Sequence, residues 1–145
     1  MQPARDGSQG AYPAGRALAP ARAKLATGGG ELGLTREALE AFETPVPAPP
    51  GGRRDAVLRF EIVFSLGYVK PYPDFPLGSS ERAYGMAGAG GSMGLADPDL
   101  QLGYGYAPNR MGFGNPTDPR EVALRAALYE AIGGPPQYRP GSQDS

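Results

Sequence analysis

Glycine and proline interrupt this chain so often that few segments can hold regular secondary structure. Together they make up 40 of the 145 residues, as 23 glycines and 17 prolines. Proline removes a backbone donor and glycine adds conformational freedom, so a chain this rich in both and without periodicity would be disordered. The fold therefore has to come from the stretches whose hydrophobic residues recur with a helical or strand period.

Alternating hydrophobic residues predict several strands in the second half of the chain. The pattern is clearest from Leu58 to Tyr68 and from Leu100 to Ala107, where every second residue is apolar or aromatic. Shorter strands are expected near Ala83 to Gly88 and from Met93 to Ala96. Asp97-Pro98-Asp99 predicts a turn, because proline presets the second turn position. We expect the two long segments to pair in one antiparallel sheet.

Two helices are predicted before these strands. An alanine-rich helix from Arg16 to Thr27, with Pro20 in its first turn, runs into the glycines at positions 28 to 30, which form a natural stop. Thr35 is a suitable N-cap for a second helix from Arg36 to Phe42.

The strongest helix signal lies after the strands. Asp118 precedes Pro119, and Glu121 follows in the first turn, an arrangement that resembles a capping box. The helix is expected to run from Pro119 to Ile132 and to cover the sheet with an apolar side of Leu124, Leu128, Ala131 and Ile132. Helices, antiparallel strands and a closing helix, in this order, predict an α+β fold with packed helices.

The ends of the chain lack this periodicity. Residues 1–15 are polar and glycine-rich and predict a disordered lead-in, and residues 135–145 predict a disordered tail. The folded domain is therefore expected to span residues 16–134.

Two missing residue types limit the chemistry. The chain has no cysteine and no histidine, which excludes disulfides, zinc–thiolate sites, imidazole ligands and any Ser-His-Asp triad. We expect no metal and no cofactor. A formal net charge of −1 gives no basic surface for nucleic acid or an anionic membrane. No signal peptide or membrane-spanning segment is recognisable, so a cytoplasmic bacterial protein is expected.

Two short motifs are interpreted as structural. Gly28-Gly29-Gly30-Glu31-Leu32-Gly33 has the spacing of a dinucleotide-binding loop, but it follows a helix where that loop requires a strand. Asp97 and Asp99 have the residue types of an acid–base pair, yet beside Pro98 they are typical turn residues.

The segment from Tyr84 to Ser92 is the most informative. A strand so poor in side chains lets a ligand approach its backbone N–H groups, as an oxyanion-stabilising strand requires. A crowded sheet or a flexible bulge would show the same composition, so composition alone leaves both interpretations open.

Four blocks, in order, resemble the ending of the serine β-lactamase-related hydrolases, which include class C β-lactamases, family VIII carboxylesterases and penicillin-binding-like proteins. The blocks are Gly28 to Thr35, Arg59 to Leu66, Ala83 to Asn109 and Asp118 to Ile132. Gly88-Ala89-Gly90-Gly91-Ser92-Met93-Gly94-Leu95-Ala96-Asp97-Pro98 carries most of the resemblance. It implies the C-terminal lobe of the β-lactamase/transpeptidase-like fold, about the last third of such an enzyme.

The resemblance also implies a site. Met86-Ala87-Gly88 occupies the place of the family's K-T-G or H-x-G strand motif, with methionine replacing the polar first residue. The backbone N–H of Ala89 aligns with the family's strand-side oxyanion donor, and we expect it on a strand, directed into a concave site.

The family's other two motifs are missing. The residues three places before Lys24 and Lys70, the only lysines, are Ala21 and Gly67, so no S-x-x-K exists, and no Y-x-N exists either. We expect this chain to be inactive alone and to need the missing N-terminal part of the hydrolase, whose substrate would be a small ester or β-lactam. A truncated or split gene product, an enzyme seen only in part, and a non-catalytic binding module remain as alternatives.

Overall fold

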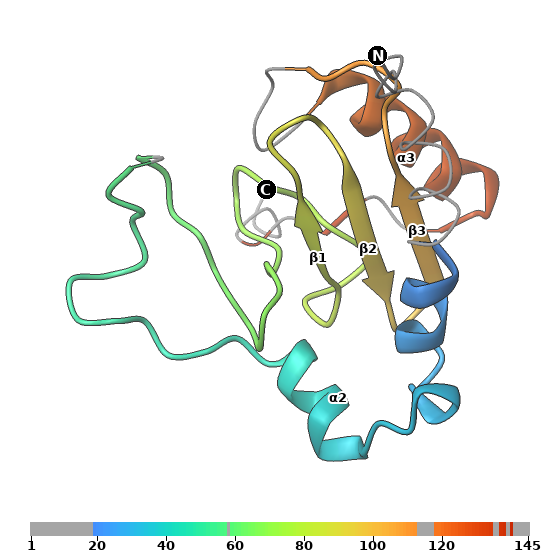
Figure 1. Ribbon diagram of the computed structural model, residues 1–145, viewed down its shortest axis with the longest axis horizontal. Helices are drawn as coiled ribbons and strands as arrows, with labels where there is room; N and C mark the ends of the chain where they lie inside the picture. The colour runs from blue at the N-terminus through green and yellow to red at the C-terminus, as the bar shows by residue number, and fades with distance from the viewer. Residues whose placement is uncertain (1–18, 58, 113–117, 135–136, 139, 141–145) are drawn as a thin grey trace, which may run out of the picture.

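The computed structural model describes residues 19–57, 59–112, 118–134, 137–138 and 140 (Figure 1). Residues 19–26 are helical and are followed by the 3-10 helix η1 (Gly30–Leu32) and the α-helix α2 (Arg36–Glu43). Strands β1 (Tyr84–Ala87), β2 (Met93–Asp97) and β3 (Leu102–Tyr106) come next, and the helix α3 (Pro119–Ala131) follows them. The predicted α+β class is confirmed.

The helix ends follow from local chemistry. The Gly29 N–H donates to the Lys24 carbonyl at 2.8 Å, and Gly29 has a φ of 64°, which favours glycine. The Thr35 hydroxyl accepts from the Ala38 N–H at 3.3 Å, and the Asp118 carboxylate accepts from the Arg120 N–H at 3.0 Å. The glycine stop and both predicted N-caps are therefore confirmed.

The strands form one antiparallel sheet in the order β1-β2-β3. Met93 lies opposite Ala87 on one side and opposite Tyr106 on the other. The turn between β2 and β3 closes where the Gln101 N–H donates to the Pro98 carbonyl at 3.2 Å. The three strands predicted between residues 83 and 107 are confirmed, with ends that differ by at most two residues.

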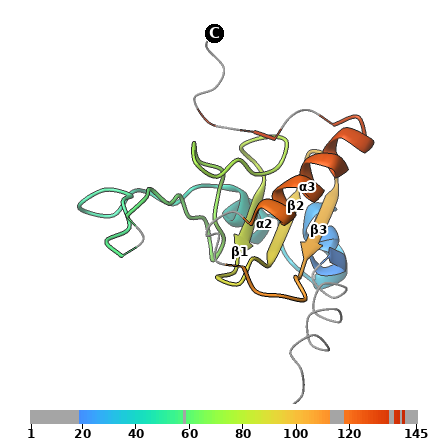
Figure 2. The ribbon, with the colours of Figure 1, turned by 90° about the horizontal axis from the view of Figure 1, so that it is seen from above.

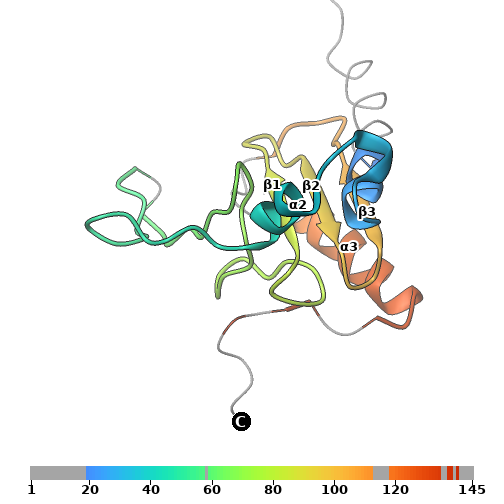
Figure 3. The same cartoon turned by 90° about the horizontal axis from the view of Figure 1, so that it is seen from below.

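Helices cover both faces of the sheet, as Figure 2 and Figure 3 show. Helix α3 shares the larger core with one face (Met93, Leu95, Tyr104 and Tyr129). The helix at residues 19–26 shares a second core with the other face (Leu25, Ala26, Tyr84 and Ala96). Gly103 allows that helix to approach, because a Cβ at this position would lie only 2.0 Å from the Ala23 nitrogen.

The strand predicted from Leu58 to Tyr68 is wrong. Leu58 itself lies outside the described residues, and residues 59–68 make only isolated bridges, in which Glu61 faces Arg54 and Phe64 faces Val69. The segment does not pair with β3, which lies beside β2. The chain that follows α2 instead projects from the body as an arm (Figure 1).

The backbone of this segment shows why alternation misled the prediction. Its peptide groups bond to a neighbouring loop and to α2: the Val46 N–H donates to the Phe64 carbonyl at 2.8 Å, and the Leu66 N–H donates to the Ala41 carbonyl of α2 at 3.1 Å. Arg59 and Gly67 have φ values of 66° and 75°, which break an extended conformation. Alternation reports which side chains share a face, but it does not supply a partner strand.

The predicted apolar side of α3 is wrong in part: Leu128 packs against the larger core, but the other three residues are exposed. Leu124 and Ile132 are 52% and 49% exposed, whereas the buried residues of the helix are Glu121, Arg125 and Tyr129. These three recur every four residues, so they share one face. Polar contacts therefore add to hydrophobic packing in holding α3: Arg125 donates to the Pro76 carbonyl, and the Tyr129 hydroxyl donates to Asp97 of β2.

Two of the described residues in the predicted tail bond to the body of the protein. The Tyr138 N–H donates to the Gly78 carbonyl at 2.7 Å, and the Gln137 side chain accepts from Arg125. The predicted lead-in at residues 1–15 lies outside the described residues. Within the described ranges, no helix is long and apolar enough to cross a membrane.

Candidate functional site

The third-motif residues are Met86, Ala87 and Gly88, which stand in place of the K-T-G or H-x-G strand motif. They lie at the end of β1 and in the turn that follows. Met86 and Ala87 are the last two residues of β1, and Gly88 follows them. The turn of residues 88–92 is closed by the Gly91 N–H, which donates to the Gly88 carbonyl at 2.9 Å. Ala89 lies within this 88–92 turn and not on a strand, which corrects that part of the prediction.

The outer edge of β1 is open beyond Gly85. Gly85 exchanges two hydrogen bonds with Val69, at 2.8 and 2.9 Å, on the edge away from β2. The N–H and C=O groups of successive residues point to opposite edges of a strand, so those of Ala87, two residues after Gly85, point to the same outer edge as those of Gly85. Within the described part of the chain, no carbonyl accepts from the Ala89 N–H. These N–H groups are therefore the candidate backbone donors at this end of the sheet.

The side chains of the motif add little chemistry. Met86 is 39% exposed and has no group that transfers a proton or carries charge. Ala87 and Gly88 have little or no side chain to cover the backbone. A side chain at position 88 would clash, because its Cβ would lie 2.3 Å from the Ser92 hydroxyl oxygen. The site is thus defined by main-chain donors, which survive a change of side chain.

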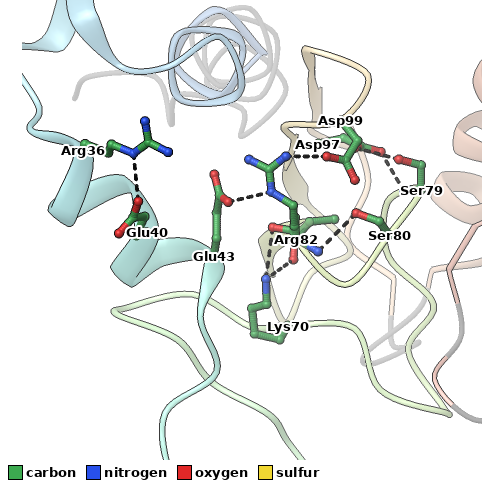
Figure 4. A network of polar contacts seen from close by, with 10 residues as sticks. Arg36, Glu40, Glu43, Lys70, Ser79, Ser80, Arg82, Asp97 and Asp99 are labelled. Atoms are coloured by element: carbon green, nitrogen blue, oxygen red, sulfur yellow. Dashed lines mark hydrogen bonds and ion pairs between the residues drawn. The ribbon is translucent and has the colours of Figure 1, made fainter.

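A hollow of about 780 Å³ lies elsewhere, between the helix at residues 19–26, α2 and the turn that joins β2 to β3. Ion pairs line its wall: Arg36 with Glu40 at 2.9 Å and Arg82 with Glu43 at 2.8 Å (Figure 4). Its charged groups already have partners, and the third-motif residues do not line it. We therefore place the candidate site at the 88–92 turn.

The two aspartates that flank Pro98 do not converge on a site. Asp97 is buried, and its carboxylate accepts from the Ser79 N–H and the Tyr129 hydroxyl, both at 2.7 Å. Asp99 pairs with Arg82 at 2.5 Å. Both carboxylates are occupied by structural contacts. Asp99 lies in the turn, as predicted, whereas Asp97 is the last residue of β2.

Neither lysine forms a nucleophile–base pair with a described serine. Lys24 pairs with Glu31 at 3.0 Å. Lys70 is buried, and its ammonium donates to the carbonyls of Arg82 and Ala83 at 3.0 and 2.7 Å (Figure 4). Burial lowers the pKa of Lys70 to about 8, although Glu43 and Glu81 oppose this shift.

Sequence reasoning missed a contact that reaches the 88–92 turn. Asp118 was recognised as an N-cap, but its carboxylate also lies against Gly91, where a Cβ would be 2.5 Å from Oδ2. The only signal was the glycine itself, because a close approach to a backbone requires the absence of a side chain.

The chain is similar to solved structures of hydrolase-type proteins. A penicillin-binding protein homolog from Caulobacter crescentus matches 79% of this chain with 33% identity and a TM-score of 0.69, and a family VIII carboxylesterase matches 78% with 30% identity and a TM-score of 0.67. EstA from Arthrobacter nitroguajacolicus Rue61a matches 69% with 31% identity and a TM-score of 0.55. No family model and no curated protein match the chain.

These matches cover only part of each neighbour. The chain spans 31%, 30% and 25% of the three structures, respectively. Identity and fold agree over most of the present chain, so the likeness extends beyond a shared architecture. The chain is therefore similar, in sequence and in fold, to about a third of a β-lactamase-like serine hydrolase.

Proposed function

We propose that this chain supplies the oxyanion-stabilising strand and turn of a β-lactamase-like serine hydrolase, which forms and hydrolyses an acyl-enzyme. The observation that carries the proposal is the Ala89 N–H, which lies at the open end of β1 without an acceptor among the described residues. A backbone donor at such a position would stabilise the negative charge of a tetrahedral intermediate. The substrate of the complete hydrolase would be a small ester or a β-lactam.

The nucleophile and its base would come from a part of the hydrolase outside these 145 residues. Both lysines are engaged by groups other than serines, as described above. Removing one oxyanion donor typically costs about 3 kcal/mol, whereas losing a nucleophile and its base costs on the order of a millionfold in turnover. The Ala89 donor cannot replace a missing serine and lysine, so this chain alone is expected to be inactive.

The remainder of the hydrolase is the expected partner, and open sheet edges support this. Beyond Gly85 no described segment pairs with β1, and none pairs with the outer edge of β3. Val57, Phe64 and Leu66 are 86%, 42% and 56% exposed. Unpaired edges and exposed apolar side chains favour association, so the chain made alone is expected to form oligomers or aggregates.

The proposal is tested with a serine-directed acylating probe. The coding sequence immediately upstream is expected to contain S-x-x-K and Y-x-N, and the segment that it encodes is produced together with this chain. The probe should then label the upstream serine and leave the chain alone unlabelled. Stoichiometric labelling of this chain alone, lost on Lys24→Ala or Lys70→Ala, would contradict the proposal.

Ala89→Pro tests the donor itself. Proline lacks the N–H and is favoured at the second position of a turn, where Ala89 lies and where its φ is not positive. In the assembled hydrolase this variant should slow acylation by roughly 10²–10³-fold. Ala89→Gly keeps the N–H and is the matched control, so equal rates for the two variants would exclude Ala89 as the donor.

A non-catalytic binding module derived from the same fold is the alternative. It would need no upstream S-x-x-K or Y-x-N, and it would bind an ester or β-lactam without turning it over. Absence of both motifs upstream would therefore favour the binding module.

A further inference from the structure

The 88–92 turn is held from outside as well as by its own hydrogen bonds. The Gly112 N–H donates to the Gly90 carbonyl at 3.0 Å, which ties the turn to the loop that follows β3. A Cβ at Gly90 would lie 3.1 Å from the Met111 side chain, so turn and loop are in close contact. The direction of the turn therefore depends on what fixes residues 110–112.

An ion pair at the start of α3 fixes that loop. The Arg120 guanidinium donates to the Arg110 carbonyl at 3.0 Å and to both oxygens of Asp118, from Nε at 2.9 Å and from Nη2 at 2.6 Å. The Asp118 side chain is only 2% exposed. Its Oδ2 lies 2.5 Å from the Cβ positions that Gly91 and Gly112 would have. One carboxylate thus contacts both the turn and the loop.

Capping alone does not account for this arrangement. An N-cap requires one carboxylate oxygen and one backbone N–H, and the bond from the Arg120 N–H to Asp118 Oδ1 satisfies that requirement. The guanidinium adds a second function, because it orients Oδ2 against the two glycines and reaches the Arg110 carbonyl. Hydrogen bonds from Arg120 also hold the pKa of Asp118 at about 2, so the pair stays ionised at neutral pH.

We propose that Asp118 and Arg120 are positioning residues that fix the 88–92 turn and thereby the direction of the Ala89 N–H. The significance of this direction rests on the proposed role of Ala89 as an oxyanion donor. The pairing has an electrostatic consequence as well. A bare carboxylate beneath an oxyanion site would oppose the charge that develops there, and a guanidinium bound to both of its oxygens offsets that charge.

The proposal is tested by amide hydrogen exchange in the assembled hydrolase, with only this chain isotopically labelled and read residue by residue by NMR. Arg120→Ala leaves the N-cap oxygen and the backbone N–H in place. Exchange at Gly91 and Gly112 should accelerate roughly tenfold, the factor expected for losing about one charge-assisted hydrogen bond, while the Leu128 amide in α3 changes less than about twofold. Arg36→Ala, which removes an exposed pair on α2, should alter none of these rates.

A second variant keeps the test decisive if Arg120→Ala unfolds. Arg120→Lys retains the charge but cannot reach two acceptors through a fixed fork, so it should fold and give an intermediate acceleration at the same amides. Unchanged exchange at Gly91 and Gly112, or equal acceleration along α3, would overturn the positioning role. The readout involves no chemistry, so it is independent of the Ala89→Pro result, and either proposal can fail while the other stands.

Discussion

Arg125→Met is expected to be among the most destabilising single substitutions in this chain. The guanidinium is fully buried and bonds the Glu121 carboxylate from Nε at 2.7 Å and from Nη2 at 3.2 Å. It also donates to the Pro76 carbonyl at 2.8 Å and to Gln137. Methionine has a similar length but no donor, so Glu121 would remain buried without its partner.

The expected loss is about 3–5 kcal/mol, the usual consequence of removing one partner of a buried ion pair. For a chain of this size that corresponds to a fall in Tm of roughly 6–20 °C. The chain offers a matched control, because Arg36 and Glu40 form the same i,i+4 pair on α2 with side chains 88% and 59% exposed. Arg36→Met should change the free energy of unfolding by only about 0.3–0.5 kcal/mol.

Urea unfolding followed by far-UV circular dichroism measures both variants. A double variant, Glu121→Leu with Arg125→Met, should recover part of the loss, because an apolar pair avoids the burial of a lone charge. Recovery should be incomplete, since the Pro76 carbonyl still lacks its donor. If Arg125→Met and Arg36→Met differ by less than about 1 kcal/mol, the view that the buried pair anchors α3 is wrong.

Three further predictions follow from the packing. Gly103→Ala should destabilise by about 1–3 kcal/mol in urea unfolding, because the new Cβ meets the Ala23 backbone, whereas Gly30→Ala, which has open space, should have little effect. The pKa of Lys70 is about 8 in the folded chain and 10.5 ordinarily, so between these pH values the unfolded chain binds more protons than the folded chain. The free energy of unfolding should therefore rise as the pH increases from 8 towards 10.5. Lys70→Met should abolish this rise. Burial raises the pKa of Tyr72 and Tyr84 to about 12, so these tyrosines should lower the free energy of unfolding as the pH rises above 10. A Tm that does not rise between pH 8 and pH 10 would contradict the burial of the Lys70 ammonium. Tyr129→Phe should cost about 1.5–3 kcal/mol in the same unfolding assay, because Asp97 loses a buried donor at 2.7 Å, and an unchanged midpoint would show that this bond contributes nothing.

Local signals were sufficient where the chain interacts with its own neighbours in sequence. The caps at Thr35 and Asp118, the glycine stop after residue 26 and the turn at residues 98–101 each depend on a few consecutive residues. The alternation of Leu102, Tyr104 and Tyr106 likewise placed these side chains on the face that packs in the larger core. Such features survive in any fold that keeps the local conformation.

Hydrophobic periodicity could not predict the contacts between segments that are far apart in the sequence. Residues 59–68 alternate as well as β3 does, but no described strand pairs along them, and their peptide groups bond to loops and to α2. The buried face of α3 carries Glu121 and Arg125, although hydrophobic periodicity places charged residues on the solvent side of a helix. Their burial is favourable because the Pro76 carbonyl, far away in the sequence, accepts a hydrogen bond from Arg125.

The candidate site also combines features that the sequence predicts and features that depend on tertiary contacts. The sequence by itself determined that the segment from Tyr84 to Ser92 is rich in glycine and begins as a strand, because these properties belong to the residues themselves, and it left the accessibility of the N–H groups open. Only the tertiary structure decided that Ala89 lies in the turn, that β1 is open beyond Gly85 and that Asp118 and Arg120 reach the turn from α3. These depend on segments far apart in the chain, and their proximity is set by packing, which no local pattern encodes.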